Sequence, residues 1–243
     1  MRWFIVLLVS ITLSFSASLK VAVAANMSYA IDALVKDFSS IDPDAKISTT
    51  ISSSGKLAAQ IAHGAPYDIF LSANTSYVAK LYKQHISQKP VVYAYGALVY
   101  LSRDPQDFSD LKQLLLSQKV QKIAIANPKT APYGKAAFEA LQNLGVLNQI
   151  KHKFIYGESI SQTLTYTLRA TEIGIVAKSA IFAPPLSHLN NAKHYKDIDA
   201  KLYTPIKQAG AIIKNTPLAK KFLSYLQSNR AKKILQKYGY NTP

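Results

Sequence analysis

The sequence has 243 residues, and 29 Lys and Arg against 13 Asp and Glu give a formal net charge of +16. Only four of the basic residues are arginines and the lysines are scattered along the chain, which argues against a nucleic-acid-binding protein and favours a solvated basic surface. The sequence contains no cysteine, so no disulfide stabilises the fold, no cysteine can carry a lipid, and a hydrophobic core must supply the stability.

The first 18 residues have the composition of an export signal. Arg2 supplies a positive charge, residues 3–13 form an apolar run, and residues 16–18 are small, as a signal peptidase requires. The apolar run is short for a transmembrane span. We therefore expect residues 1–18 to be a signal peptide that is cleaved after Ser18, and we expect a periplasmic protein without a lipid anchor.

Short apolar runs alternate with helical patterns along the rest of the chain. This alternation predicts an α/β protein with mainly parallel sheets flanked by helices. Strands are predicted at residues 19–24, 46–51, 68–72, 91–101, 122–126, 152–156, 173–177, 201–204 and 207–213. Helices are predicted at residues 27–39, 55–63, 75–83, 109–117, 133–144, 159–170, 178–182, 216–227 and 230–237.

A two-lobed arrangement with a ligand cleft between the lobes fits this pattern. The chain contains no low-complexity linker, charge block or repeat, so strands must join the lobes. The long run 91–101 is the predicted first crossing, and the segment 203–211 is the predicted return. Lobe 1 is then residues 19–93 plus 205–243, and lobe 2 is residues 94–204.

The loops that follow four predicted strands are the candidate ligand site. In open α/β sheets, ligands lie beyond the carboxyl ends of the strands, at the N-termini of the next helices. Such an N-terminus offers unpaired backbone N–H groups and the positive end of the helix dipole, and it therefore suits an anion. In the first loop, Asn26 can cap the following helix through its oxygen or can turn its amide NH₂ toward an anion.

The other three loops offer hydroxyl and backbone donors. Ser54 belongs to a serine-rich segment that ends in Gly55, where a ligand can approach the backbone closely. Tyr133 follows two prolines at the start of a predicted helix, and its phenol can either donate to a ligand or pack over the helix end. In the fourth loop a serine can cap the helix, and the N–H groups near Ile160 lack helical partners.

Together these segments resemble the molybdate-binding periplasmic proteins of ABC transporters. The resemblance covers nearly the whole chain after residue 18, and the combination of a serine loop with Gly-Ala-Pro-x-Asp is fairly specific. The matching segments are residues 21–26, 52–61, 64–73, 124–128, 133–134, 172–177 and 231–240.

The resemblance implies an oxyanion site made by Asn26, Ser54, Tyr133 and the backbone N–H of Ile160. The sequence differs from the family pattern at Ala177, where some members have a tyrosine that hydrogen-bonds the ligand. It further implies a periplasmic binding protein that is not an enzyme, needs no cofactor, acts as a monomer and delivers molybdate or tungstate to a membrane permease. Molybdenum would be present only as the oxyanion, with no direct protein ligand to the metal.

The chemistry of the candidate donors agrees with this implication. Molybdate and tungstate are fully deprotonated near neutral pH and can only accept hydrogen bonds, whereas a protonated phosphate also needs an acceptor. Two alternatives stay open. The chain could bind another solute, such as sulfate, phosphate, iron or an organic anion, or Ser53 and Lys56 could form the Ser-x-x-Lys pair of a penicillin-interacting enzyme.

Overall fold

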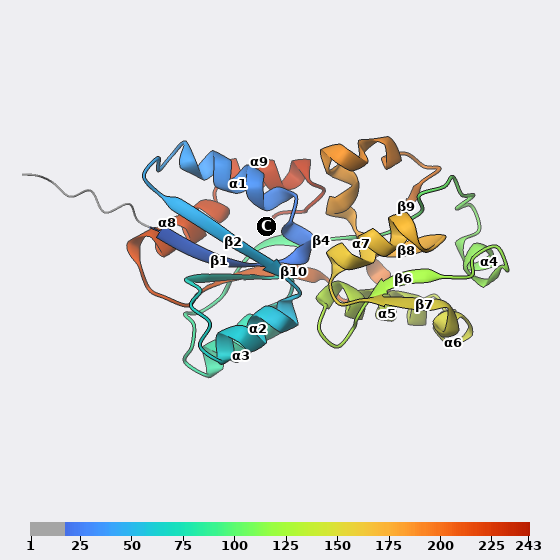
Figure 1. Ribbon diagram of the computed structural model, residues 1–243, viewed down its shortest axis with the longest axis horizontal. Coiled ribbons are helices and arrows are strands. Elements are labelled where there is room, and N and C mark those ends of the chain that lie inside the picture. The colour runs from blue at the N-terminus through green and yellow to red at the C-terminus, as the bar shows by residue number, and fades with distance from the viewer. Residues whose placement is uncertain (1–17) are drawn as a thin grey trace, which may run out of the picture.

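The computed structural model describes residues 18–243, so the predicted signal peptide lies outside the described residues except for Ser18. The chain forms two five-stranded sheets that lie side by side (Figure 1). The strand order is β2-β1-β3-β10-β4 in the first sheet and β7-β6-β8-β5-β9 in the second. We call each sheet, with the helices that cover its faces, the first unit and the second unit.

The first unit has helices on both faces of its sheet. Its strands are β1 (Ser18–Ala24), β2 (Lys46–Ser52), β3 (Ile69–Ser72), β4 (Val91–Gly96) and β10 (Ile206–Ile212). Its helices are α1 (Ala30–Ser39), α8 (Pro217–Leu226) and α9 (Asn229–Lys237) on one face, and α2 (Ser54–Ala62) and α3 (Thr75–Lys83) on the other. Successive side chains of β1 point to opposite faces of the sheet. Val21 and Val23 pack toward α1 and α8, while Ala22 packs toward α2.

The second unit repeats this layering. Its strands are β5 (Leu98–Leu101), β6 (Ile123–Ala126), β7 (Phe154–Gly157), β8 (Ile173–Ala177) and β9 (Tyr195–Asp197). Its α-helices are α4 (Leu111–Leu116), α5 (Pro132–Asn143), α6 (Leu147–Ile150) and α7 (Ile160–Arg169). Short 3₁₀ turns complete the chain: η1 (Ala25–Met27), η2 (Lys151–Lys153), η3 (Lys178–Phe182), η4 (Pro184–Leu189) and η5 (Ala200–Leu202). Within residues 18–243, no helix has both the length and the apolarity that a membrane crossing requires.

Both sheets are mixed rather than purely parallel. In the first, β1 pairs in parallel with β2 and β3, while β10 is antiparallel to β3 and β4. In the second, β6 is parallel to β7 and β8, while β5 is antiparallel to β8 and β9. The expected α/β order therefore holds for three strands of each sheet, and the antiparallel strands are those next to the crossings between the units.

The crossings lie in the two predicted regions but differ from them in detail. The predicted strand 91–101 breaks at Ala97, so that β4 belongs to the first sheet and β5 to the second. The predicted strand 201–204 is wrong, because η5 occupies residues 200–202 and the last strand of the second sheet is β9 instead. The chain changes sheet between Gly96 and Leu98 and again between Asp197 and Ile206; the predicted lobe boundaries at 93/94 and 204/205 stay a prediction.

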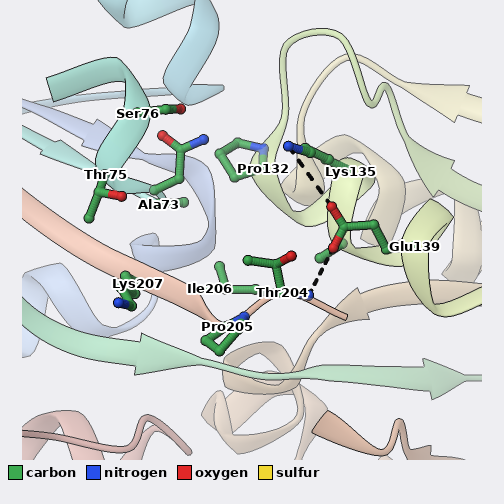
Figure 2. Close-up of a pocket in the computed structure, with 12 residues that line it drawn as sticks. Ala73, Thr75, Ser76, Pro132, Lys135, Glu139, Thr204, Pro205, Ile206 and Lys207 are labelled. Atoms are coloured by element: carbon green, nitrogen blue, oxygen red, sulfur yellow. Dashed lines mark hydrogen bonds and ion pairs between the residues drawn. The ribbon is translucent and has the colours of Figure 1, made fainter. Parts of the chain in front are cut away.

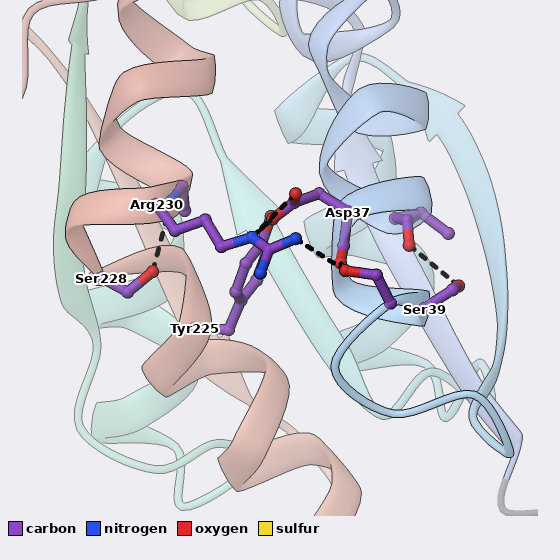
Figure 3. A network of polar contacts seen from close by, with 8 residues as sticks. Asp37, Ser39, Tyr225, Ser228 and Arg230 are labelled. Atoms are coloured by element: carbon purple, nitrogen blue, oxygen red, sulfur yellow. Dashed lines mark hydrogen bonds and ion pairs between the residues drawn. The ribbon is translucent and has the colours of Figure 1, made fainter.

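A polar network ties α1 to α8 and α9 on the outer face of the first unit (Figure 3). The Arg230 Nε donates to both carboxylate oxygens of Asp37, at 2.7 and 2.9 Å, and its Nη2 donates to the Ser40 hydroxyl at 2.7 Å. The Tyr225 hydroxyl donates to the same carboxylate at 2.8 Å. Hydrogen bonding from Arg230 lowers the pKa of Asp37, while burial, aided by Asp37, raises the pKa of Tyr225.

Candidate functional site

Four segments meet at the junction of the two units, each at the carboxyl end of a strand. They are η1 after β1, α2 after β2, α5 after β6 and α7 after β7. Their first residues surround a cavity of about 190 Å³, lined by Ala24, Ala25, Asn26, Ser53, Ser54, Ala73, Ala131, Pro132, Tyr133 and Ile160. The structure therefore brings all four sequence-predicted site residues together at one place, two from each unit.

The cavity is neutral and has several potential donors. None of its lining residues is an Asp, Glu, Lys, Arg or His. Across residues 18–243, no group of three or more His, Asp or Glu side chains is placed to hold a metal ion. The positive potential at this point comes instead from the starts of helices, whose first N–H groups have no partner within the helix.

Ser54 and Ser53 place two hydroxyls at the start of α2. Ser54 is 1% exposed, and its Oγ accepts a hydrogen bond from the Ala73 N–H at 3.0 Å, which leaves its proton available to donate. Ser53 is the N-cap residue of α2 but makes no side-chain capping bond, and its buried Oγ has no partner among the described residues. The sequence analysis did not select Ser53 as a ligand contact, because nothing in a run of three serines distinguishes one from the next.

Tyr133 reaches from α5 toward the first unit. It is buried, and its hydroxyl has no hydrogen-bond partner within residues 18–243. A Cβ at Gly96 of β4 would lie only 2.0 Å from that hydroxyl, so the phenol lies directly over the glycine. Burial, with a smaller contribution from Tyr240, raises the pKa of Tyr133 well above its ordinary value. The phenol therefore stays neutral and can donate to an anion.

Asn26 does not behave as the sequence analysis expected. The helix α1 begins at Ala30, so Asn26 lies in η1 and does not cap it. Its Nδ2 donates to the Gln208 Oε1 at 2.9 Å and to the Tyr240 hydroxyl at 2.8 Å, so both amide hydrogens are engaged. Its Oδ1 is buried without a partner among the described residues. The NH₂ group is therefore not turned toward the cavity in this structure.

Ile160 is the first residue of α7, where the backbone N–H groups have no helical acceptor. The preceding Ser159 caps the helix by accepting from the Gln162 N–H at 3.2 Å, which leaves the N–H of Ile160 free of that cap. The next residue, Ser161, donates its hydroxyl to the Ala25 carbonyl of η1 at 2.9 Å. This bond connects α7 to the first unit at the edge of the cavity.

Other contacts across the cavity show that the two units are closed on each other. The Gly55 N–H donates to the Thr130 carbonyl at 2.9 Å, and Ser179 donates to the Asn26 carbonyl at 2.9 Å. At the rim, the exposed side chains of Lys56 and Glu158 form an ion pair between α2 and the loop before α7. The sequence-predicted departure, Ala177, borders a second small cavity behind Asn26 and Ile160.

A larger cavity of about 540 Å³ lies beside the candidate site and shares Ala73 and Pro132 with it. Figure 2 shows it between α3, α5 and the segment that enters β10. Its wall carries the carboxylate of Glu139, which pairs with Lys135 at 3.9 Å and accepts from the Thr204 N–H at 2.8 Å. Lys207 also lines this cavity, so its wall carries charges of both signs. The smaller, neutral cavity stays the candidate anion site because all four predicted site residues line it.

Comparisons with known proteins agree with this fold. Residues 19–241 match the family described as bacterial extracellular solute-binding proteins. The molybdate-binding protein ModA of Azotobacter vinelandii is 32% identical over 93% of this chain and 90% of its own, and that of Rhodobacter capsulatus is 35% identical over 78% and 75%. A solved structure of the Azotobacter vinelandii periplasmic molybdate-binding protein superposes with a TM-score of 0.85 at 30% identity, covering 93% of this chain and 99% of that one.

Proposed function

The chain belongs to the ModA family of bacterial extracellular solute-binding proteins, and from this we propose that it binds molybdate or tungstate in the cavity between its two units. Members of this family are substrate-binding proteins of ABC transporters and are not enzymes. Ser53 and Lys56 are therefore not a catalytic pair, and Lys56 instead pairs with Glu158. In the proposed role the protein is a periplasmic monomer without a lipid anchor, and it delivers the anion to a membrane permease.

The observation that carries this proposal is the neutral, donor-rich lining of the closed cavity. A deprotonated oxyanion needs donors on every side and no carboxylate. We propose that Ser54 and Tyr133 donate through their hydroxyls, and that Ile160 donates through its backbone N–H. Asn26 contributes its backbone N–H at the start of η1, since its side-chain nitrogen is engaged elsewhere. We propose Ser53 as a fifth donor, because its buried hydroxyl has no partner in the part of the chain that the structure describes.

One observation favours a second candidate ligand. The Oδ1 of Asn26 is a buried acceptor without a partner within residues 18–243. A buried acceptor left unpaired costs about 1–3 kcal/mol. Hydrogen phosphate carries a proton that it could donate to this oxygen, whereas molybdate carries none. Hydrogen phosphate is therefore the alternative that a binding experiment must include.

Replacement of Ser54 by Ala tests the proposed site. Loss of a hydrogen bond to a charged ligand costs about 1.5–3 kcal/mol, so the dissociation constant for molybdate should rise about 10- to 100-fold. The Ser53→Ala variant should weaken binding in the same direction. Ser76→Ala is the matched control, because Ser76 is exposed in the first turn of the neighbouring helix α3 and does not line the cavity. Unchanged affinity in Ser54→Ala, with the fold intact, would refute its assigned role.

A further inference from the structure

Residues from the last strand and the C-terminal segment hold Asn26 on several sides. The Tyr240 hydroxyl accepts from the Asn26 Nδ2 and donates to the Asn26 backbone carbonyl, both at 2.8 Å. Gln208 takes the second amide hydrogen at 2.9 Å. The Ser179 hydroxyl, from η3 of the second unit, is the second donor to the same carbonyl, at 2.9 Å. This carbonyl is therefore a point where the first unit, the second unit and the C-terminal segment meet.

An irregularity in the pairing of β10 with β4 lies next to Gln208. Gln208 lies opposite Ala94 and Ala209 lies opposite Val92, so the additional residue is Tyr93 of β4. Gln208 is fully buried, and its Nε2 donates to the Ile206 carbonyl at 3.3 Å. That bond fixes the nitrogen end of the Gln208 amide, so its oxygen end faces Asn26. The orientation of the Gln208 amide in turn determines which end of the Asn26 amide it binds.

The segment that carries Tyr240 is itself tied to both units. Asn241 exchanges two backbone hydrogen bonds with Tyr95 of β4, at 2.7 and 3.0 Å. Gly239 has a φ of +73°, and a Cβ there would lie 2.7 Å from the ring of Phe182 in η3. The C-terminus lies at the first unit, below α1 and α9 in the view of Figure 1. The segment is therefore placed to connect the Asn26 loop to the crossing strand and to the second unit.

We propose that Tyr240 and Gln208 are positioning residues of the anion site. The Tyr240 hydroxyl, together with that of Ser179, binds the Asn26 carbonyl, and Tyr240 and Gln208 hold the Asn26 amide by its nitrogen. These bonds fix the backbone of η1 at the cavity. A carbonyl that swung toward the bound dianion would repel it, because both are negative. The proposal rests on the proposed function, since it takes Asn26 to be part of the ligand site.

Tyr240→Phe tests the proposal, with Tyr238→Phe as the matched control from the same segment. The first measurement needs no anion: hydrogen exchange of the Asn26 side-chain NH₂, followed by NMR on the full chain. We expect slow exchange in the wild type, faster exchange in Tyr240→Phe and no change in Tyr238→Phe. The second measurement is the affinity for molybdate, which should fall about tenfold in Tyr240→Phe and stay unchanged in the control.

A purely structural Tyr240 would give a different result. It would lower the melting temperature but leave the affinity within about twofold of the wild type, and this outcome would overturn the proposal, as would unchanged exchange of the Asn26 amide. If the wild type binds neither molybdate nor tungstate, the proposed function fails. The exchange measurement then still tests the positioning role, and the variants are titrated with whichever of sulfate or phosphate binds the wild type.

Discussion

The site depends on one glycine as much as on its donors. Gly96 ends β4, at the crossing between the units, and the Tyr133 hydroxyl occupies the space where a side chain would begin. A Cβ at this position would also lie 2.9 Å from the Gln208 Nε2. Any side chain at residue 96 must therefore displace a proposed ligand donor or the amide that orients Asn26.

Gly96→Ala is expected to weaken molybdate binding at least tenfold. Its methyl group would lie 2.0 Å from the Tyr133 hydroxyl, so the phenol must move away from the cavity. Isothermal titration of the variant measures the loss. In a Tyr133→Phe background, where the hydroxyl is absent, the same change should cost clearly less affinity. Equal losses in the two backgrounds would show that Gly96 does not act through the Tyr133 hydroxyl.

The sequence predicts the four residues that the structure places at one cavity, but it does not predict the polar contacts that hold Asn26. Asn26, Ser54, Tyr133 and Ile160 each follow a strand and begin a helix or turn, which is a local signal. Gln208 and Tyr240 lie 182 and 214 residues from Asn26 in the chain. Tyr240 ends the matching segment 231–240, but nothing in that segment points to Asn26. Only the fold brings them together, so the engagement of the Asn26 amide could not be read from the local pattern.

At the scale of elements, apolar periodicity predicts the buried strands and the long helices well. The predicted bounds of β8 and α3 agree with the structure. Errors occur where tertiary contacts decide. The continuous run 91–101 divides because each half pairs with a different sheet, and residues 201–204 do not form a strand. One element contact also depends on charge, since Arg230 of α9 holds Asp37 of α1.

Asp37→Asn tests that contact through its pH dependence. The folded-state pKa of Asp37 is lowered by Arg230, so the stabilisation is present above the ordinary value of 3.8 and is lost as the pH falls through the lowered pKa. At pH 7 the wild type should exceed the variant by about 1 kcal/mol in free energy of unfolding, because the pair is only partly buried. The difference should shrink below about pH 4 in denaturant titrations.

Asp104→Asn provides the control for this experiment. Asp104 pairs with its neighbour Arg103 at 3.0 Å, and both side chains are largely exposed. Its removal should leave the free energy of unfolding unchanged within experimental error at all of these pH values. A difference between the wild type and Asp37→Asn that stays constant from pH 7 to pH 3 would mean that the Asp37 carboxylate charge is not responsible.

At the scale of the whole molecule, the site exists only when the two units are together. Each unit contributes two of the four sequence-predicted residues, and neither pair alone surrounds an anion. The units also meet directly, through hydrogen bonds such as that between Gly55 and Thr130 and through apolar packing of Ala25 and Ala73 with the core of the second unit. Because the chain crosses between the sheets at two places within residues 18–243, we expect a hinge motion between the units.

Small-angle X-ray scattering should detect that motion. The radius of gyration is expected to fall when molybdate is added to ligand-free protein, because the anion bonds both units and stabilises the closed arrangement. The same molybdate concentration is chosen to lie below the dissociation constant of Ser54→Ala. At this concentration the variant should keep the radius of gyration of the ligand-free protein. Identical scattering with and without saturating molybdate would contradict ligand-driven closure.

Calorimetric titration of the wild-type protein with molybdate, tungstate, sulfate and phosphate in parallel tests the central claim most directly. A cavity lined by neutral donors between two closing units should bind molybdate and tungstate tightly and give no heat of binding with the other two. Tight binding of phosphate instead would support the alternative ligand and favour a contact with the Asn26 Oδ1, which has no partner within residues 18–243. If folded, ligand-free protein gave no heat of binding with molybdate or tungstate, this result would contradict the assigned ligand.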